Sequence, residues 1–114
     1  MMTFFEKLST APESISFLET MALVDELYEY APTSFSNGEL VNEAGQNEGS
    51  CKLFAMARLN DLTEQHTLSC FGKYYREDVL KHPDGNDHQN IRNFMTSGWS
   101  GIDFDTMPLT AKQG

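Results

Sequence analysis

Hydrophobic residues recur with a helical period near the start of this chain. The stripe consists of Phe17, Met21, Val24 and Tyr28. Thr10 and Glu13 have the spacing of a capping box, and Pro12 suits the first turn of a helix because its missing N–H costs nothing there. The pattern therefore predicts one long helix over residues 11–30, ended by Pro32.

Similar apolar stripes predict further helices downstream. The expected segments are a short helix from about Thr3 and main helices over 51–60, 64–82 and 88–97. We expect Ser50, Thr63 and Asp87 to be the N-caps of the three main helices, since short polar side chains accept hydrogen bonds from free amides there. Gly98 is well placed as the residue that ends the last helix.

Short alternating runs predict a small sheet. Asn37-Gly38 is a strong hairpin signal, and it would join strands at 33–36 and 39–42. A third strand is expected at 101–105, and the polar tail 110–114 is expected to fray. The whole pattern predicts a helix-rich α+β protein, one domain over residues 1–114, with about four main helices and a small sheet that includes a β-hairpin.

The length of 114 residues fits one domain with its own core. The N-terminus, MMTFFEKLST, has neither a basic region nor a long apolar region, so we expect no secretory signal peptide. No apolar run approaches the length of a membrane span. Two cysteines are too few for a disulfide framework, and we expect both as free thiols in a reducing compartment.

Charge is distributed unevenly. The net charge is −9, and residues 1–50 hold nine acidic side chains against Lys7 alone, which gives −8. Such a surface repels phosphate backbones and anionic lipid, so we expect neither nucleic-acid nor membrane binding. A protein partner stays compatible with this charge, and the sequence leaves the oligomeric state open.

Cys51 is the main candidate for chemistry. It follows a polar loop at the expected start of a helix, where the helix dipole and Lys52 would lower the pKa of a thiol. In a thiol enzyme, Gln46 would supply an oxyanion donor and His88 or His66 the base. The alternative is that Cys51 is a small packing residue, because free cysteines are often buried. No spacing matches a known metal or cofactor motif, and none is expected.

Three segments resemble the HopJ family, whose members are usually named type III effector proteins. The segments are PTSFSNGELVNEAGQNEGSCKLFAMARL, CFGKYYREDVLKHPDGNDHQNIRNFM and GWSGIDFD, and the resemblance covers about residues 12–106. It implies a small bacterial protein of the cytoplasm, with type III export as an alternative location. It carries over no catalytic residues, so whether the protein is an enzyme stays open. We expect it to bind a protein or a small ligand, with a thiol enzyme based on Cys51 as the alternative.

Overall fold

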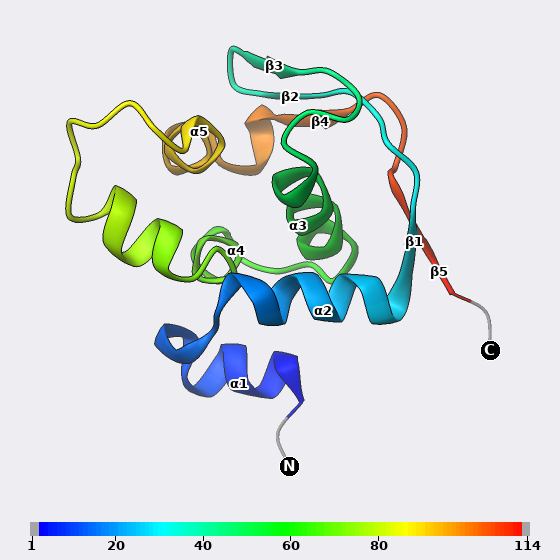
Figure 1. The fold of residues 1–114 in the computed structure, drawn as a ribbon, viewed down its shortest axis with the longest axis horizontal. Helices are drawn as coiled ribbons and strands as arrows, with labels where there is room; N and C mark the ends of the chain where they lie inside the picture. The colour runs from blue at the N-terminus through cyan, green and yellow to red at the C-terminus, as the bar shows by residue number, and fades with distance from the viewer. Residues whose placement is uncertain (1–2, 113–114) are drawn as a thin grey trace.

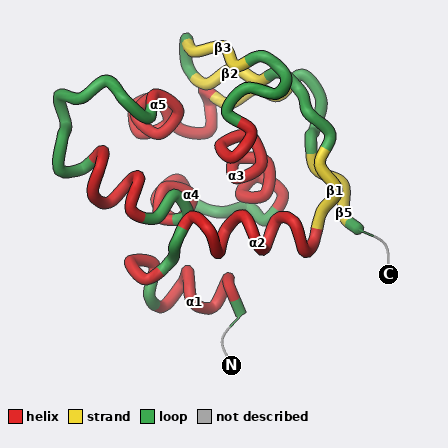
Figure 2. The backbone as a smooth tube through the Cα atoms, in the orientation of Figure 1, coloured by secondary structure: helices red, strands yellow, loops and turns green. Residues whose placement is uncertain are grey.

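Helix α3 (Glu48–Leu59) lies at the centre of the fold, as the computed structural model of the chain shows. The structure describes residues 3–112. Helix α2 (Phe17–Leu27) crosses on one side of α3, and α5 (Gln89–Ser97) lies with the short strands β2, β3 and β4 on the other side (Figure 1). Figure 2 shows how helices dominate this arrangement, with strands confined to two places at its margin.

The core is built around the apolar side of α3. Phe54 is fully buried, and its ring lies 5.0 Å from the ring of Phe94 and 5.5 Å from that of Phe71. Phe35 and Trp99 approach the same ring at 6.3 and 6.4 Å. These rings come from four different elements and the turn after α4, so burial of α3 holds most of the chain together.

The N-terminal segment is broken into shorter pieces than predicted. The short helix expected from about Thr3 is confirmed as α1 (Phe4–Thr10). The predicted helix over 11–30 is wrong at both ends, because a 3-10 turn η1 (Pro12–Ser14), α2 and the strand β1 (Tyr28–Tyr30) occupy these residues. The capping box forms earlier, where the Thr3 hydroxyl accepts from the backbone of Glu6. Ser16 caps α2 by accepting from Glu19. Each polar cap gives the chain another place to start a helix.

The predicted hairpin is confirmed, one residue later than expected. Strand β2 (Phe35–Asn37) pairs with β3 (Leu40–Asn42) in antiparallel register, so the two-residue turn is Gly38-Glu39. Among the described turn residues only Gly38 has a positive φ, of 63°, which fits a type II′ turn rather than type I′. The predicted third strand is β4 (Ile102–Phe104), which pairs with the other edge of β2.

A second sheet was not predicted. The strands β1 and β5 (Leu109–Ala111) form an antiparallel pair at the margin of the molecule (Figure 1). The expectation of a frayed tail is therefore wrong for residues 110–111, while residues 113–114 lie outside the described part. Leu109 is buried in the core, and this anchors a polar strand that has little apolar pattern of its own.

The predicted helix over 64–82 is interrupted at Gly72. Helix α4 (Glu64–Ser69) begins at the expected cap, Thr63, and a π-helix, η2 (Tyr74–Val79), follows the break. Gly72 has a φ of +64°, and a side-chain carbon there would lie 2.8 Å from the backbone nitrogen of Phe17. Close approach of two backbone segments thus requires glycine at this position.

Helix α5 ends where expected but begins one residue late. Its N-cap is His88 rather than Asp87, and Gly98 ends it with a φ of 61°. The N-cap of α3 is Asn47 rather than Ser50. A short 3-10 turn, η3 (Gly98–Gly101), then leads into β4. The helix-rich α+β class with a small sheet and a hairpin is confirmed, and no helix within residues 3–112 combines the length and apolar character of a membrane span.

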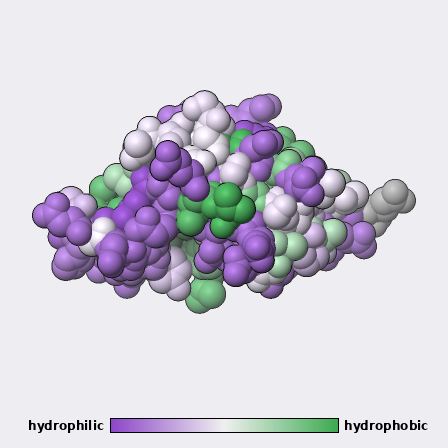
Figure 3. Space-filling view, turned by 90° about the horizontal axis from the view of Figure 1, so that it is seen from above, coloured by the Kyte–Doolittle hydropathy of each residue, from purple (hydrophilic) through white to green (hydrophobic). Residues whose placement is uncertain are grey.

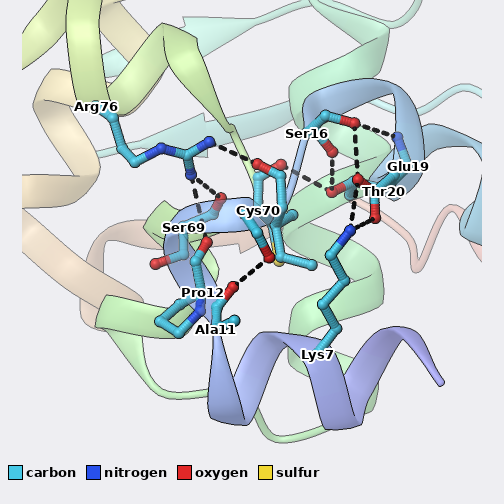
Figure 4. Close-up of polar contacts among 11 residues, drawn as sticks. Lys7, Ala11, Pro12, Ser16, Glu19, Thr20, Ser69, Cys70 and Arg76 are labelled. Atoms are coloured by element: carbon cyan, nitrogen blue, oxygen red, sulfur yellow. Dashed lines mark hydrogen bonds and ion pairs between the residues drawn. The ribbon is translucent and has the colours of Figure 1, made fainter. Parts of the chain in front are cut away.

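Charged and hydroxyl side chains fasten the N-terminal segment to the rest of the fold. Lys7 forms an ion pair of 2.8 Å with Glu19, and the Thr20 hydroxyl donates to the backbone oxygen of Cys70 at 2.8 Å (Figure 4). Arg76 reaches across from η2 and donates to backbone oxygens of Ile15, Pro12 and Ser69 at 2.7, 3.4 and 3.5 Å. We call Lys7, Glu19, Thr20, Cys70 and Arg76 the N-terminal clasp.

Candidate functional site

A cleft of about 530 Å³ opens where α3 and α5 begin. The polar residues of its wall come from the first turns of these two helices and the residues before them: Asn47, Ser50, His88, Gln89 and Asn90. Its aromatic residues come from α2 and the segment that follows α4: Phe17, Phe71 and Tyr74. The volume is in the range of small-molecule sites, and a few polar groups beside an apolar wall are typical of them.

The two residues that precede the helices have unusual backbones. Asn47 has a φ of 51° and His88 a φ of 49°, both in the left-handed region. Residues other than glycine rarely adopt this conformation, and such positions tend to cluster at functional sites. Among described non-glycine residues only Asp61 shares the property, so two of the three line this one cleft.

Behind the cleft lies a network of asparagine side chains. Asn42 and Asn90 form a reciprocal amide pair, each Nδ2 donating to the other Oδ1 at 3.1 and 3.0 Å. Asn47 donates to Asn42 Oδ1 at 2.7 Å, and Asn37 donates to Asn90 Oδ1 at 3.0 Å. The side chains of Asn37, Asn42 and Asn90 are buried. We call these four residues the asparagine network; it ties the hairpin to the starts of α3 and α5.

His88 is paired with a carboxylate. Its Nε2 lies 3.0 Å from Asp78 Oδ2, and Asp78 sits on the π-helix η2. This geometry assigns the proton of the neutral ring to Nε2 and leaves Nδ1 as an acceptor. The ring of Tyr74 lies 5.2 Å from the imidazole. A hydrogen bond from Arg92 lowers the pKa of Asp87, the second carboxylate near His88.

Cys51 faces away from this cleft. Its side chain is buried in the core, and burial raises the pKa of the thiol to about 11. The neighbouring Tyr30 hydroxyl opposes this rise and Glu48 adds to it. The thiol is therefore neutral at physiological pH, although it lies in the first turn of a helix. Desolvation outweighs the helix dipole here, and the arrangement favours the packing role.

The partners predicted for Cys51 are dispersed. Gln46 is exposed, and its side-chain oxygen accepts from the backbone of Glu43 at 3.1 Å in the loop before α3. His66 lies within α4 and is not part of the cleft wall. Of the predicted site residues only His88 lines the cleft. Ser50 of α3, predicted as an N-cap, lines the cleft where Cys51 does not.

The cleft does not contain an assembled catalytic pair. Within residues 3–112 no hydrogen bond joins Ser50 to His88, and the Ser50 hydroxyl has no partner. Over the same residues no group of three or more His, Cys, Asp or Glu side chains is placed to hold a metal ion. What the cleft offers is a set of uncharged hydrogen-bonding groups, which suits binding.

Sequence reasoning missed the asparagine network and the role of Asp78. The only available signal was the even spacing of Asn37, Asn42 and Asn47 along the chain. Their side chains meet because the hairpin folds back over the start of α3, and no local pattern encodes that contact. Asp78 has no local signal that sets it apart from the other acids of its segment, and it contacts His88 only because the fold places η2 beside the start of α5.

The fold and the cleft thus define a small, helix-rich α+β protein with a polar cleft between two helix starts. A model of the HopJ type III effector protein family matches residues 1–109, and the chain belongs to this family. It is similar over nearly its whole length to the crystal structure of VPA0580, a protein of unknown function. That likeness has a TM-score of 0.94 and 54% identity, and it covers 96% of this chain and 91% of the other. No curated protein gives a match.

Proposed function

We propose that this HopJ-family protein binds a small ligand in the cleft between the starts of α3 and α5. The observation that carries the proposal is the combination of a cleft of about 530 Å³ with polar groups that the fold holds in place but leaves without hydrogen-bond partners. Ser50 has no hydrogen-bond partner in the described structure, and Nδ1 of His88 is likewise unbonded there. Free polar groups beside aromatic rings are what a ligand site needs.

Binding is better supported than catalysis. The buried, neutral thiol of Cys51 cannot reach the cleft wall, and the Asp78–His88 pair has no nucleophile bonded to it among the described residues. An Asp–His pair can also serve to fix the orientation of an imidazole that contacts a ligand. We assign His88 that contact, and we give Asp78 the task of holding the ring.

A fragment screen tests this proposal directly. Small molecules of varied charge and shape are added to ¹⁵N-labelled protein, and shifted amide signals are mapped onto the fold. We expect the largest shifts at residues 47–50 and 88–91. Fragments that bind only elsewhere, at every concentration up to the millimolar range, would contradict the proposal.

Matched variants sharpen the screen. Ser50→Leu places a bulky side chain at the cleft wall and should abolish the mapped shifts. Ser36→Leu changes a β2 residue outside the cleft wall and should leave them unchanged. Both variants must first show the thermal unfolding transition of a folded protein. Equal loss of binding in both would argue against this location.

Export is a separate proposal, supported by the family description alone. We propose that a type III secretion system exports the chain. The first twelve residues contain a single acidic side chain, Glu6, which suits such a signal, although Leu8 is buried and packs on the core. Fusion of residues 1–20 to a reporter, compared in strains with and without the secretion machine, tests it. Equal release from both strains would refute it.

A further inference from the structure

We infer that the cleft selects an uncharged, planar ligand with an amide-type edge, such as the cyclic amide ring of a pyrimidine. This inference rests on the proposed binding function and names the chemical class of the ligand. It follows from three properties of the wall: its charge, the way its amides are held, and the rings beside them.

The wall has no formal charge to pair with an ion. Within the described residues, its polar side chains are amides, the hydroxyls of Ser50 and Tyr74 and one imidazole, with no Lys, Arg, Asp or Glu among them. Affinity for a charged ligand would need a buried counter-charge, because removing an ion from water costs several kcal/mol otherwise. A neutral ligand avoids this cost.

The helix starts do not supply the missing positive charge. The free amides of a helix N-terminus attract anions, and both α3 and α5 begin at the cleft. Each start is already offset by acids of this chain, however. Glu48 lies in the first turn of α3, and Asp87 and Asp78 lie 3.8 and 3.0 Å from the His88 ring at the start of α5. The chain as a whole carries −9.

The asparagine network fixes two amides at the wall. Asn90 Oδ1 accepts from Asn37 and Asn42, and Asn90 Nδ2 donates to Asn42 Oδ1. Asn47 Nδ2 donates to the same oxygen of Asn42. Within the described structure Asn47 Oδ1 has no partner, and each Nδ2 of this pair retains a second hydrogen. Fixed donors and acceptors of this kind discriminate by complementarity, because a mismatched ligand leaves them unpaired.

Aromatic rings provide the flat surface. The ring of Tyr74 lies 5.3 Å from that of Phe17 in an edge-to-face arrangement, and Phe17 is stacked on Phe71 at 6.3 Å. All three line the cleft. Planar heterocycles pack well on such rings, and every base-like ring has a face to offer them.

The face of the molecule on the side of β2, β3 and α5 is mostly polar. Figure 3, viewed from the side of β2, β3 and α5, shows a largely hydrophilic surface at the end where residues 80–88 lie, with a small hydrophobic patch near the middle. Large apolar partners are therefore less well matched to this face than small polar ligands.

Four probes separate the ligand classes: uridine, glucose, benzoate and inorganic phosphate. Each is titrated into the full chain at constant ionic strength while the side-chain amide signals of Asn47 and Asn90 are followed by NMR. We expect uridine to cause saturable shifts and the other three to cause none at the same concentrations. Uridine monophosphate should bind more weakly than uridine, because its phosphate enters an acidic surrounding.

Variants then test the amide edge. Asn47→Gly keeps the left-handed backbone but removes the amide, and it should weaken uridine binding roughly five-fold, as expected for the loss of one hydrogen bond of about 1 kcal/mol. Asn93→Ala lies on α5 outside the cleft wall and should bind uridine unchanged. Thermal unfolding of both variants verifies that they fold.

The outcomes separate this inference from the proposed function. If phosphate, benzoate or glucose shifts the cleft signals and uridine does not, the neutral planar class is wrong while small-ligand binding stands. Uridine binding that Asn47→Gly leaves intact also overturns the amide edge. If neither these probes nor the varied fragments shift the cleft signals, both proposals fall.

Discussion

The cleft wall and the N-terminal clasp use polar side chains in opposite ways. In the clasp, Arg76 and Thr20 donate to backbone oxygens, and Lys7 pairs with Glu19, so the groups that meet there satisfy one another. At the cleft, the asparagine network bonds its buried members to one another but leaves Asn37 Oδ1 without a partner. It also leaves groups of Asn47 and of the nearby Ser50 unbonded in the described structure. The clasp is complete without a ligand, whereas the cleft wall is not.

This difference distinguishes a structural cluster from a candidate site. Both regions join segments far apart in the chain, and both contain polar groups that burial would penalise if they were left alone. Contact density therefore does not tell them apart. What distinguishes the cleft is unused hydrogen-bonding capacity that the fold holds in position beside empty space. Variants in the clasp should accordingly change the free energy of unfolding and not ligand binding, whereas variants of the cleft wall should change ligand binding.

The largest expected effect lies beside the clasp, at Gly72. Gly72→Ala should destabilise the protein by on the order of 3 kcal/mol, because the new carbon meets the backbone of Phe17 and φ is positive. Gly45→Ala is a matched control with a φ of +89° but nothing within 4 Å, so it should cost only about 1 kcal/mol. Urea unfolding measures both. An equal loss of stability in both variants would show that the close approach of the two backbones does not add to the destabilisation.

A similar loss is expected at the centre of the asparagine network. Asn42→Ala should cost about 2–3 kcal/mol, because it leaves the buried amide of Asn90 without its reciprocal partner. It should also weaken any ligand that binds the cleft. Asn93→Ala serves as the control in the same urea experiment. If the Asn42→Ala protein is destabilised but binds with full affinity, the asparagine network does not contribute to ligand binding.

A smaller loss is expected at Arg76. Arg76→Met keeps the apolar stem but removes the guanidinium, and it should cost about 1–2 kcal/mol, since one strong hydrogen bond to Ile15 is lost and the freed oxygen regains water in part. Fragment binding at the cleft should stay unchanged. Arg76→Lys, which keeps a donor, should lose less stability. A loss of cleft binding in either variant would contradict the separation of the two regions.

The raised pKa of the Cys51 thiol makes the stability of the fold depend on pH. Burial raises the pKa of Cys51 from about 9 to about 11, so the folded state keeps a proton that the unfolded state releases. Stability from this group is complete below pH 9 and declines as pH rises towards 11. Between pH 8.5 and 10 the decline should amount to about 1 kcal/mol for Cys51, and Cys51→Ala should remove it. An unchanged slope would mean that the folded thiol ionises, and the thiol-enzyme alternative would regain support.

The smallest effect on stability should accompany a clear effect on binding. Ser50→Ala should change the free energy of unfolding by less than about 0.5 kcal/mol, because the hydroxyl has no partner in the described structure. It should nevertheless weaken the fragment that binds best at the cleft. Destabilisation by more than 1 kcal/mol would show that the hydroxyl has a structural task.

Local signals predicted much of the helical framework. The apolar stripe on α3, the cap at Thr63 and the glycine end of α5 are properties of a few consecutive residues, and they appear where expected. The long helix over 11–30 failed at its start because more than one polar residue could serve as its cap, and the helix begins after Ser16 rather than after Thr10. Strand β5 was missed because its residues are mostly polar, and pairing with β1 together with the burial of Leu109 holds it in place.

The sequence alone determined the class of fold, the acidic character of the chain, the hairpin and the choice of His88 as a candidate site residue. Only the tertiary structure decided that Ser50 faces the cleft while Cys51, the next residue, faces the core. Successive helix positions are rotated by about 100°, so the placement of α3 sets which side chain is buried. It also decided the asparagine network, because hydrogen bonds between residues 42 and 90 depend on how distant segments pack.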